Sequence, residues 1–465
     1  MDSASPHRPL PQRERRAANT GDEVTLRSRA ARLAALAAAA GVLLVGIPSP
    51  ASAVGPATGV RTATSDSQCT ASTRIPETPP ALTSLQSASA WPLTRGSGVT
   101  VAVVDSGVAA NPHLDGAVLP GVNLVPDGTD AAGRTDTYAH GTVIAGQIAA
   151  QLISGSGIQG LAPDAKILPV RVYAGTEKQL VDAGFGPNTG RIAEGIRYAA
   201  DQGAQVINVS ISTSDKNATL ADAVAYAQQR GSLVVASSGN RGNTDSVEQN
   251  DQDGARYPAG FSGVIGVAAV GSGGVVTSAS IHGPHVSLSA PGQSIASAWP
   301  LGGDCVVGAD EPASSWATAY VSAAAALVAS AHPSETPAQW AYRLEATAVR
   351  AQPDTRSNVS GWGVVQPYDA IVMVPGTGLR GPKSPFVAAS PSASPSATPE
   401  AVAVVIGPGP DAAAITTATG IGVVGIIALG AIGALAVYVS RRREETAPRR
   451  AAPTGRGLYG PEEKE

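Results

Sequence analysis

The chain has 465 residues and a net charge of −4, and only 15% of its residues are charged. This length accommodates one large domain with accessory segments, or about two to three average domains. With so few charges and a slightly negative balance, no polybasic surface is available, and we expect no nucleic-acid partner. Two cysteines, Cys69 and Cys305, are too few for a disulfide scaffold. One disulfide between them and two separate buried thiols both remain open.

The N-terminal region has the pattern of an export signal. Residues 27–53 read "RSRAARLAALAAAAGVLLVGIPSPASA". Three arginines precede an apolar run from Leu33 to Ile47, which is too short to span a bilayer, and Ala51-Ser52-Ala53 follows as a small-residue cleavage site. We therefore assign residues 1–53 to a secretory signal peptide with a long n-region.

Residues 54–91 form an N-terminal extension ahead of a main domain at 92–375. In this domain, apolar runs typical of buried strands alternate with segments of helical periodicity, such as 191–203 and 219–230. The strand-like runs are "GVTVAVVDSG", "AKILPVRVY", "AQVINVSIS", "GSLVVASSGN" and "GVIGVAAVG". Strands that alternate with helices predict an α/β fold of three layers, with a central parallel sheet covered by helices on both faces.

The composition changes twice beyond the main domain. Residues 376–411 are rich in Pro, Ser and Ala, which predicts an extended linker. Residues 412–440 carry no charge and are long enough for one C-terminal transmembrane helix, although a buried core helix is the alternative. Three arginines follow at once, and positive charge stays on the cytoplasmic side. We therefore expect a cytoplasmic tail at 441–465 and a single-pass protein of the cell membrane with its main domain outside.

Four polar residues lie at strand ends or at a helix start, where the functional sites of α/β sheets form. Asp105 ends the strand in "VAVVDSGV", and Asn240 ends the strand in "VVASSGN". His140 lies in "YAHGTVIAG", and Ser315 opens a helix in "SSWATAYVS". Each has a purely structural alternative when taken singly: a turn residue for the Asp and the Asn, a core histidine, and an N-cap serine. Taken together, the order Asp, His, Ser is the order of the subtilisin triad.

In these motifs, residues 92–375 resemble the subtilisin-like serine proteases. The motifs "VAVVDSGV", "HGTVIAG", "INVS" and "SSGN" are similar to those of that family and occur in the same order. The stretches "PPALTSLQSASAWPLTRGSGV" and "GLAPDAKILPVRVY", the Pro-rich linker and the anchor with a basic tail are similar to the mycosins, membrane-bound proteases of type VII secretion systems. The resemblance implies a membrane-anchored extracytoplasmic endopeptidase that acts on protein or peptide substrates, in association with a type VII secretion membrane complex. We expect no cofactor. No carboxylate cluster indicates a metal site, although related proteases often bind calcium, so calcium dependence stays open.

The resemblance also implies roles for individual residues. Ser315 is expected to attack the scissile carbonyl, His140 to act as base and then as acid, and Asp105 to orient His140. The side-chain amide of Asn240 is expected to stabilise the oxyanion. Two further segments are expected to contact the substrate, one of them by pairing with it as an added strand. Their residues are Val209, Ser210, Ile211, Ser212, Ser237, Ser238 and Gly239.

Three positions depart from the family pattern. Ser212 stands where Gly is usual, and its side chain narrows the specificity pocket and favours restricted cleavage. Ala313 and Ala139 replace the glycines near Ser315 and His140, and Ala313 strains the backbone if its φ is positive. Because all four polar residues persist, we expect an active enzyme. The alternative is a weakly active or inactive pseudoprotease that serves as a structural component of the secretion complex.

The cysteines and two histidines complete the expectations. In mycosins the extension wraps around the catalytic domain, and many carry a cysteine just before the catalytic histidine, where this chain has Thr137. The resemblance therefore implies that Cys69 bonds to Cys305, which ties the extension beside the loop that precedes Ser315. A second alternative is a stalked binding module such as an adhesin, with a metal at "HGPH", 282–285. Two histidines without further ligands are a weak metal signal.

Overall fold

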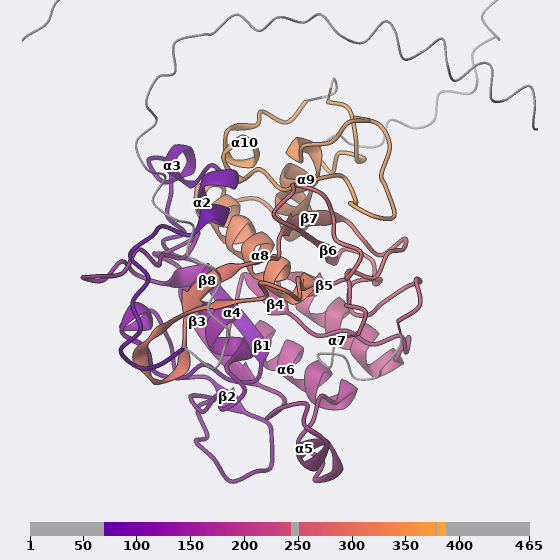
Figure 1. Ribbon diagram of the computed structural model, residues 1–465. Helices are drawn as coiled ribbons and strands as arrows, with labels where there is room; N and C mark the ends of the chain where they lie inside the picture. The colour runs from indigo at the N-terminus through magenta and orange to yellow at the C-terminus, as the bar shows by residue number, and fades with distance from the viewer. Residues whose placement is uncertain (1–68, 243–250, 377–378, 387–465) are drawn as a thin grey trace, which may run out of the picture. The chain divides into compact units, whose positions relative to one another are not determined.

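The computed structural model describes residues 69–242, 251–376 and 379–386 (Figure 1). The expected signal peptide, transmembrane helix and cytoplasmic tail lie outside these residues, as does most of the expected linker. Among the helices of the described ranges, none combines the length and the apolar character needed to cross a membrane.

A seven-stranded parallel sheet forms the centre of the fold, with strand order β2-β3-β1-β4-β5-β6-β7. All five strand-like runs of the sequence lie in it. Since β1 pairs with β3 on one side and with β4 on the other, the strand order reverses at β1, and sites in α/β sheets form at the carboxyl ends of strands at such a point. The strands are β1 (Thr100–Asp105), β2 (Val122–Asn123), β3 (Lys166–Arg171), β4 (Val206–Val209), β5 (Leu233–Ser237), β6 (Ile265–Val270) and β7 (Leu288–Pro291).

Helices cover both faces of this sheet, in two separate hydrophobic cores. On β1, Val101 and Val103 belong to one core, whereas Ala102 and Val104 belong to the other. Side chains of a strand alternate between faces, so a strand buried on both sides must be apolar throughout. This confirms the predicted α/β fold with a central parallel sheet. The covering helices are α4 (His140–Ala149) and α8 (Ser314–Ala331) on one face, and α6 (Thr189–Asp201) and α7 (Ala218–Gln229) on the other.

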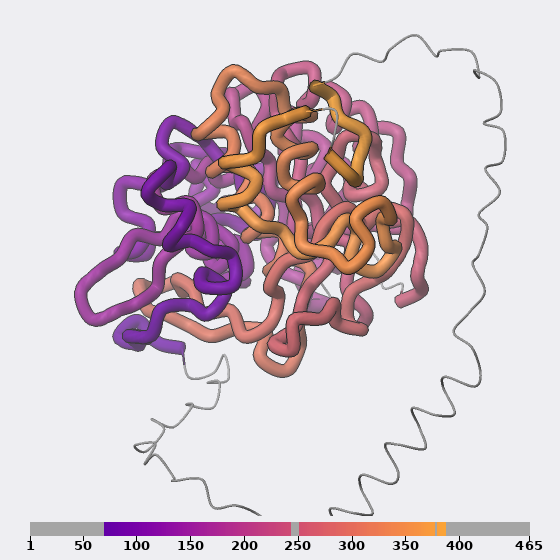
Figure 2. Tube along the Cα trace, turned by 90° about the horizontal axis from the view of Figure 1, so that it is seen from above, coloured from indigo at the N-terminus to yellow at the C-terminus, as the bar shows by residue number. Residues whose placement is uncertain are grey.

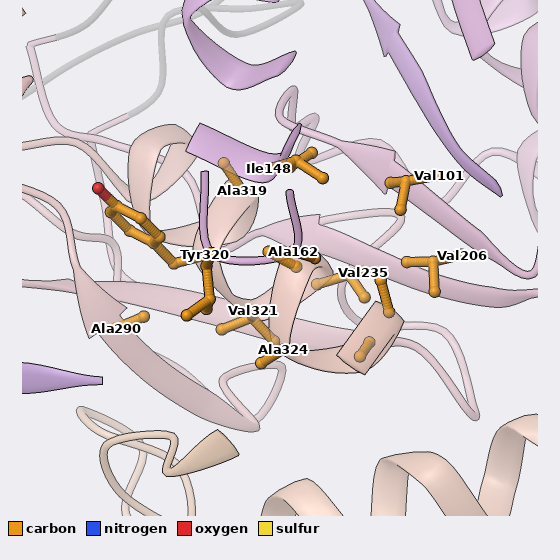
Figure 3. Close-up of a cluster of buried hydrophobic side chains, with 14 of the residues drawn as sticks. Val101, Ile148, Ala162, Val206, Val235, Ala290, Ala319, Tyr320, Val321 and Ala324 are labelled. Carbon is orange, nitrogen blue, oxygen red and sulfur yellow. The ribbon is translucent and has the colours of Figure 1, made fainter. Parts of the chain in front are cut away.

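Helix α8 passes through the first core and consists mainly of small residues. It buries 15 of its 18 residues. Figure 3 shows Val321 and Ala324 of this helix among Val206 and Val235 of the sheet. Small side chains let a helix approach the strands closely, so the core relies on dense packing rather than on large rings. The close approach fixes where the N-terminal end of α8, with Ser315, meets the sheet.

Smaller elements surround these layers. An antiparallel hairpin, β8 with β9, precedes α8, and two helices follow α8. The sequence patterns above did not predict the hairpin. The remaining elements are α2 (Pro80–Ser84), α3 (Ser87–Ala90), η2 (Pro112–Leu114), α5 (Lys178–Asp182), β8 (Ile295–Ala298), η3 (Pro300–Gly302), β9 (Asp304–Val307), α9 (Pro337–Thr347) and α10 (Pro367–Val372).

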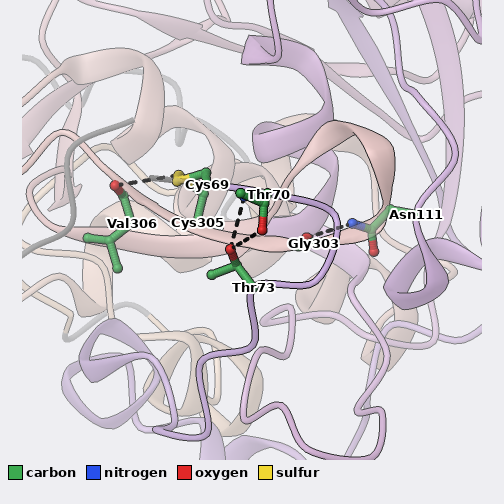
Figure 4. Close-up of a disulfide and its surroundings, with 7 residues drawn as sticks. All are labelled: Cys69, Thr70, Thr73, Asn111, Gly303, Cys305 and Val306. Carbon is green, nitrogen blue, oxygen red and sulfur yellow. Dashed lines mark hydrogen bonds between the residues drawn. A yellow bond between two sulfur atoms is a disulfide. The ribbon is translucent and has the colours of Figure 1, made fainter. Parts of the chain in front are cut away.

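The described part of the N-terminal extension is tied to the hairpin. Cys69 and Cys305 form a disulfide with Cα atoms 5.3 Å apart, in agreement with the expected pairing (Figure 4). The amide of Ile75 donates to Oδ2 of Asp304 at 2.8 Å, and the amide of Asp304 donates to the carbonyl of Thr73 at 3.0 Å. Figure 2 shows the extension, in indigo, along the outside of the domain.

The chain remains packed on the domain for a short distance after α10. Residues 379–386 fall in the expected linker 376–411, yet they lie against α9. The ring of Phe386 is 5.9 Å from that of Tyr342, and Cζ of Arg343 is 5.5 Å from the Phe386 centroid. The compact unit that contains the sheet ends at Phe386.

Candidate active site

The carboxyl end of β1 and the first residue of α4 place Asp105 and His140 side by side. Oδ1 of Asp105 lies 2.8 Å from Nδ1 of His140, and the two side chains are 0% and 3% exposed. The amide of Ser106 donates to the same oxygen at 2.7 Å. Because the carboxylate engages Nδ1, Nε2 is the ring nitrogen that can exchange a proton with a reacting group.

A second buried carboxylate, Asp136, holds the start of α4. Its Oδ1 accepts from the hydroxyl of Ser106 at 2.8 Å and from the amide of Ala139 at 2.9 Å. Its Oδ2 accepts from the amide and the hydroxyl of Thr142 at 2.8 and 2.5 Å. Burial raises the pKa of Asp136, and the bonds from Thr142 act against this rise. Asp136 therefore satisfies helix-start amides around His140. The sequence signal for it is a carboxylate four residues before His140, and the triad motif does not include it.

The two alanines that replace glycines differ in conformation. Ala139, directly before His140, has φ 71° and ψ −13°, in the left-handed region. An L-residue with a side chain loses about 1–2 kcal/mol there, so Ala139 strains the backbone. Ala313 has φ −132° and ψ 143°, which is ordinary extended backbone. The possible strain at Ala313 is therefore absent, and that alanine adds only a methyl group.

Ser315 lies in the first turn of α8, directly before the residue that packs on the imidazole of His140. The ring of the following residue, Trp316, is 4.6 Å from the imidazole, centroid to centroid. Oγ of Ser315 is buried, and within the described part of the chain it has no hydrogen-bond partner. The dipole at a helix N-terminus favours negative charge, so this position stabilises charge that develops near the hydroxyl.

Side chains from β4 and α4 hold the first turn of α8. The hydroxyl of Ser210 donates to the carbonyl of Ser315 at 3.1 Å, and Nδ2 of Asn208 donates to that hydroxyl at 3.0 Å. Nε2 of Gln147 donates to the carbonyl of Trp316 at 2.9 Å. The backbone that carries Ser315 is thus fixed from two neighbouring elements.

Asn240, just after β5, meets the N-terminus of α8. Its Oδ1 accepts from the amide of Ser314 at 2.6 Å and from the hydroxyl of Ser314 at 2.9 Å. With Oδ1 engaged in this way, the NH₂ group of Asn240 points away from Ser314. An oriented NH₂ group of this kind can donate to an oxygen that gains negative charge during a reaction.

The two predicted substrate segments, 209–212 and 237–239, are buried. The hydroxyl of Ser210 bonds to α8, and Oγ of Ser237 lies 2.6 Å from Oγ of Ser314. These side chains therefore hold the site together.

Ser212 lies against the turn that leads to Asn240. Gly239 has φ 90°, and a Cβ atom on it would lie 2.9 Å from Oγ of Ser212 and 3.2 Å from Cδ1 of Ile281. The Ser212 hydroxyl thus occupies space directly beside Gly239, the residue before Asn240.

The histidines of "HGPH" do not form a metal centre with acids or cysteines. Nε2 of His285 lies 3.0 Å from the carbonyl oxygen of Ser238, and burial lowers the pKa of His285 to about 4. Across the described ranges, no group of three or more His, Cys, Asp or Glu side chains is arranged to hold a metal ion.

Comparison with known proteins defines the class of the molecule. The model of the subtilase family matches residues 96–363, more than half of the chain. The chain therefore belongs to the subtilase family and is a subtilisin-like serine endopeptidase. Thermitase of Thermoactinomyces vulgaris is 40% identical over 248 residues, which are 53% of this chain and 80% of thermitase.

Within the family, the chain is a mycosin. Mycosin-3 of Mycobacterium tuberculosis is 32% identical over 345 residues, which cover 63% of this chain and 73% of that protein. The solved structure of the MycP3 protease from the type VII (ESX-3) secretion system is 30% identical. It superimposes with a TM-score of 0.55 and covers 64% of this chain and 91% of that one. The mycosin resemblance of the sequence is thereby confirmed.

Proposed function

We propose that this chain is a membrane-anchored, extracytoplasmic endopeptidase that cleaves a restricted set of proteins or peptides with the triad Asp105, His140 and Ser315. One observation carries the proposal: Oδ1 of Asp105 contacts Nδ1 of His140 at 2.8 Å, and Trp316, the residue after the buried Ser315 hydroxyl, packs on the same imidazole. Buried hydroxyls are normally hydrogen-bonded, and exceptions call for an explanation such as a catalytic role.

In the proposed reaction, Oγ of Ser315 attacks the carbonyl carbon of the scissile bond, and Nε2 of His140 takes the hydroxyl proton. His140 then gives this proton to the leaving amine, and a water molecule repeats the sequence on the acyl-enzyme. Asp105 holds Nδ1 and stabilises the imidazolium. The NH₂ group of Asn240 and the amide of Ser315 donate to the oxyanion.

Restricted specificity rests on Ser212. Its hydroxyl lies beside Gly239, so it reduces the room for the substrate side chain that precedes the scissile bond. We expect Ser212→Gly to broaden the range of residues accepted at that position. Digestion of a proteome-derived peptide library, read by mass spectrometry, tests this. An identical cleavage profile for both enzymes contradicts the assignment.

Membrane anchoring and the type VII association rest on the sequence and on relatives. The expected anchor at 412–440 lies outside the described residues, and the MycP3 relative comes from a type VII (ESX-3) secretion system. We expect the full chain to stay with membranes during alkaline extraction and a chain that ends at residue 411 to be released. Release of the full chain contradicts the anchor.

The alternative function is a structural component of the secretion complex with little proteolytic activity. The strained Ala139 next to His140 favours it, because strain there can displace the imidazole. A chromosomal Ser315→Ala variant separates the two functions. Normal secretion together with normal processing supports the scaffold, whereas loss of processing supports the protease.

A further inference from the structure

Tyr173 reaches the Asp105–His140 pair from the neighbouring strand. In the register of β1 and β3, Asp105 pairs with Arg171, the last residue of β3. Residue 173 therefore follows β3 at the carboxyl edge of the sheet, where Asp105 also lies. The Tyr173 side chain is fully buried, and its hydroxyl donates to Oδ1 of Asp105 at 3.1 Å. The same phenol oxygen lies 3.4 Å from Nδ1 of His140.

Oδ1 of Asp105 therefore receives three donors: the amide of Ser106, Nδ1 of His140 and the hydroxyl of Tyr173. The other carboxylate oxygen, Oδ2, has no hydrogen-bond partner within the described ranges. Donors that share one oxygen compete, because each one withdraws charge density that attracts the others. Protonation of His140 strengthens the hydrogen bond from Nδ1 to Oδ1 and weakens the hydrogen bond from the phenol to the same oxygen.

We propose that Tyr173 is a positioning residue of the triad, which fixes the carboxylate of Asp105 and moderates its attraction for the imidazolium of His140. The inference rests on the proposed function, in which His140 takes the proton of Ser315. By linkage, a phenol bond that opposes protonation of His140 makes the imidazole a weaker base. Tyr173 thereby keeps more of His140 neutral and ready to accept a proton at a given pH.

Other groups that face the pair have hydrogen-bond partners of their own that do not include the Tyr173 hydroxyl. Asp136, before α4, is held by its donors described above. The hydroxyl of Tyr138 lies 3.0 Å from that of Thr176. Arg171, at the end of β3, donates through Nε to a backbone carbonyl at 3.0 Å. From α8, the residue that faces the imidazole is Trp316, which does not titrate.

The test is the pH dependence of labelling of the full-length chain by a fluorophosphonate probe. In this reaction a bond forms between Oγ of Ser315 and phosphorus, the P–F bond breaks, fluoride leaves, and His140 takes the hydroxyl proton. The rate rises as His140 loses its proton, so the midpoint of the acid limb reports how basic His140 is. Wild type is compared with Tyr173→Phe, which removes one oxygen and keeps the ring, and with the matched control Tyr138→Phe.

We expect Tyr173→Phe to raise the midpoint of the acid limb by about half a pH unit, since the carboxylate then holds the imidazolium more strongly. The limiting rate should fall about three- to tenfold, because the carboxylate is less well oriented. Tyr138→Phe should keep the wild-type midpoint. An unshifted midpoint in Tyr173→Phe overturns the inference, and so does an equal shift in Tyr138→Phe. Failure of folded wild type to label overturns the proposed function itself, and this inference with it.

Discussion

Ser314 determines how Asn240 faces the candidate active site. Its amide and hydroxyl both bond to Oδ1 of Asn240, at 2.6 and 2.9 Å, which leaves the NH₂ group for the oxyanion. Loss of an oxyanion donor costs about 100- to 1,000-fold in rate, and loss of its orientation should cost less, about tenfold. We expect Ser314→Ala to slow fluorophosphonate labelling by this factor and Ser314→Thr to retain most of the rate. Equal rates for Ser314→Ala and wild type contradict the orienting role.

Ala139 and Ala313 form a matched pair for a test of backbone strain. Ala139 has φ 71°, so Ala139→Gly should relieve strain and stabilise the fold by about 1 kcal/mol. Ala313 has φ −132°, so Ala313→Gly only adds freedom to the unfolded chain and should destabilise by about 0.5–1 kcal/mol. Thermal unfolding midpoints of the two variants should therefore move in opposite directions. A lower thermal midpoint for Ala139→Gly than for wild type contradicts backbone strain at Ala139.

Two residues beside the triad, Tyr173 and Asp136, were not predicted from the sequence. The order Asp, His, Ser indicated Asp105, His140 and Ser315 because each follows a recognisable local motif. Tyr173 carries no motif, and its role depends on the register of β1 with β3, which sets which side chain lies beside Asp105. Asp136 could have been predicted from the sequence, since a carboxylate just before a helix start is a capping signal.

At the scale of elements, continuous apolar runs predicted five strands of the sheet because those strands are buried on both faces. The two-residue strand β2, the edge strand β7 and the hairpin β8–β9 were not predicted. A strand such as β2 is too short to show a period, and β8–β9 lies outside the main sheet, where its pattern depends on contacts with the extension. Packing, rather than local sequence, determines these elements.

Helix α9 carries a titratable group that makes stability depend on pH. Glu345 lines a cavity of about 580 Å³ together with Arg356. Burial raises the pKa of Glu345 from its ordinary value of 4.5 to about 7, and Arg356 partly offsets the rise. The stability that the protonated carboxyl supplies is fully present below pH 4.5 and is lost as pH rises through 7.

We therefore expect Glu345→Gln to lose less stability than wild type between pH 5 and pH 8, by up to about 3 kcal/mol. Thermal midpoints across this range measure the effect. The control is Glu194→Gln, at an exposed position of α6, which should follow the wild-type curve. If Glu345→Gln also follows that curve, Glu345 does not titrate as described.

At the scale of the whole molecule, one disulfide joins the N-terminal extension to β9, in the hairpin that precedes α8. Cys69 and Cys305 are 236 residues apart in the sequence, so the bond closes a long loop. Removal of such a disulfide costs about 2–5 kcal/mol, and the hydrogen bonds of Asp304 with Ile75 and Thr73 remain. We expect Cys69→Ser to lower the thermal midpoint and to expose residues 69–78 to limited proteolysis.

Reductant provides the control for this prediction. It should lower the midpoint of wild type to that of Cys69→Ser and leave Cys69→Ser unchanged. If the variant and the oxidised wild type melt together and are cleaved alike, the disulfide does not hold the extension in place.

The central claim is that Ser315 is an activated nucleophile served by His140 and Asp105. The most direct measurement is intact-mass analysis of the folded full-length chain after reaction with a fluorophosphonate probe, for wild type and for Ser315→Ala. We expect a single adduct on wild type and none on Ser315→Ala. An unmodified wild type, or equal modification of both proteins, would contradict it.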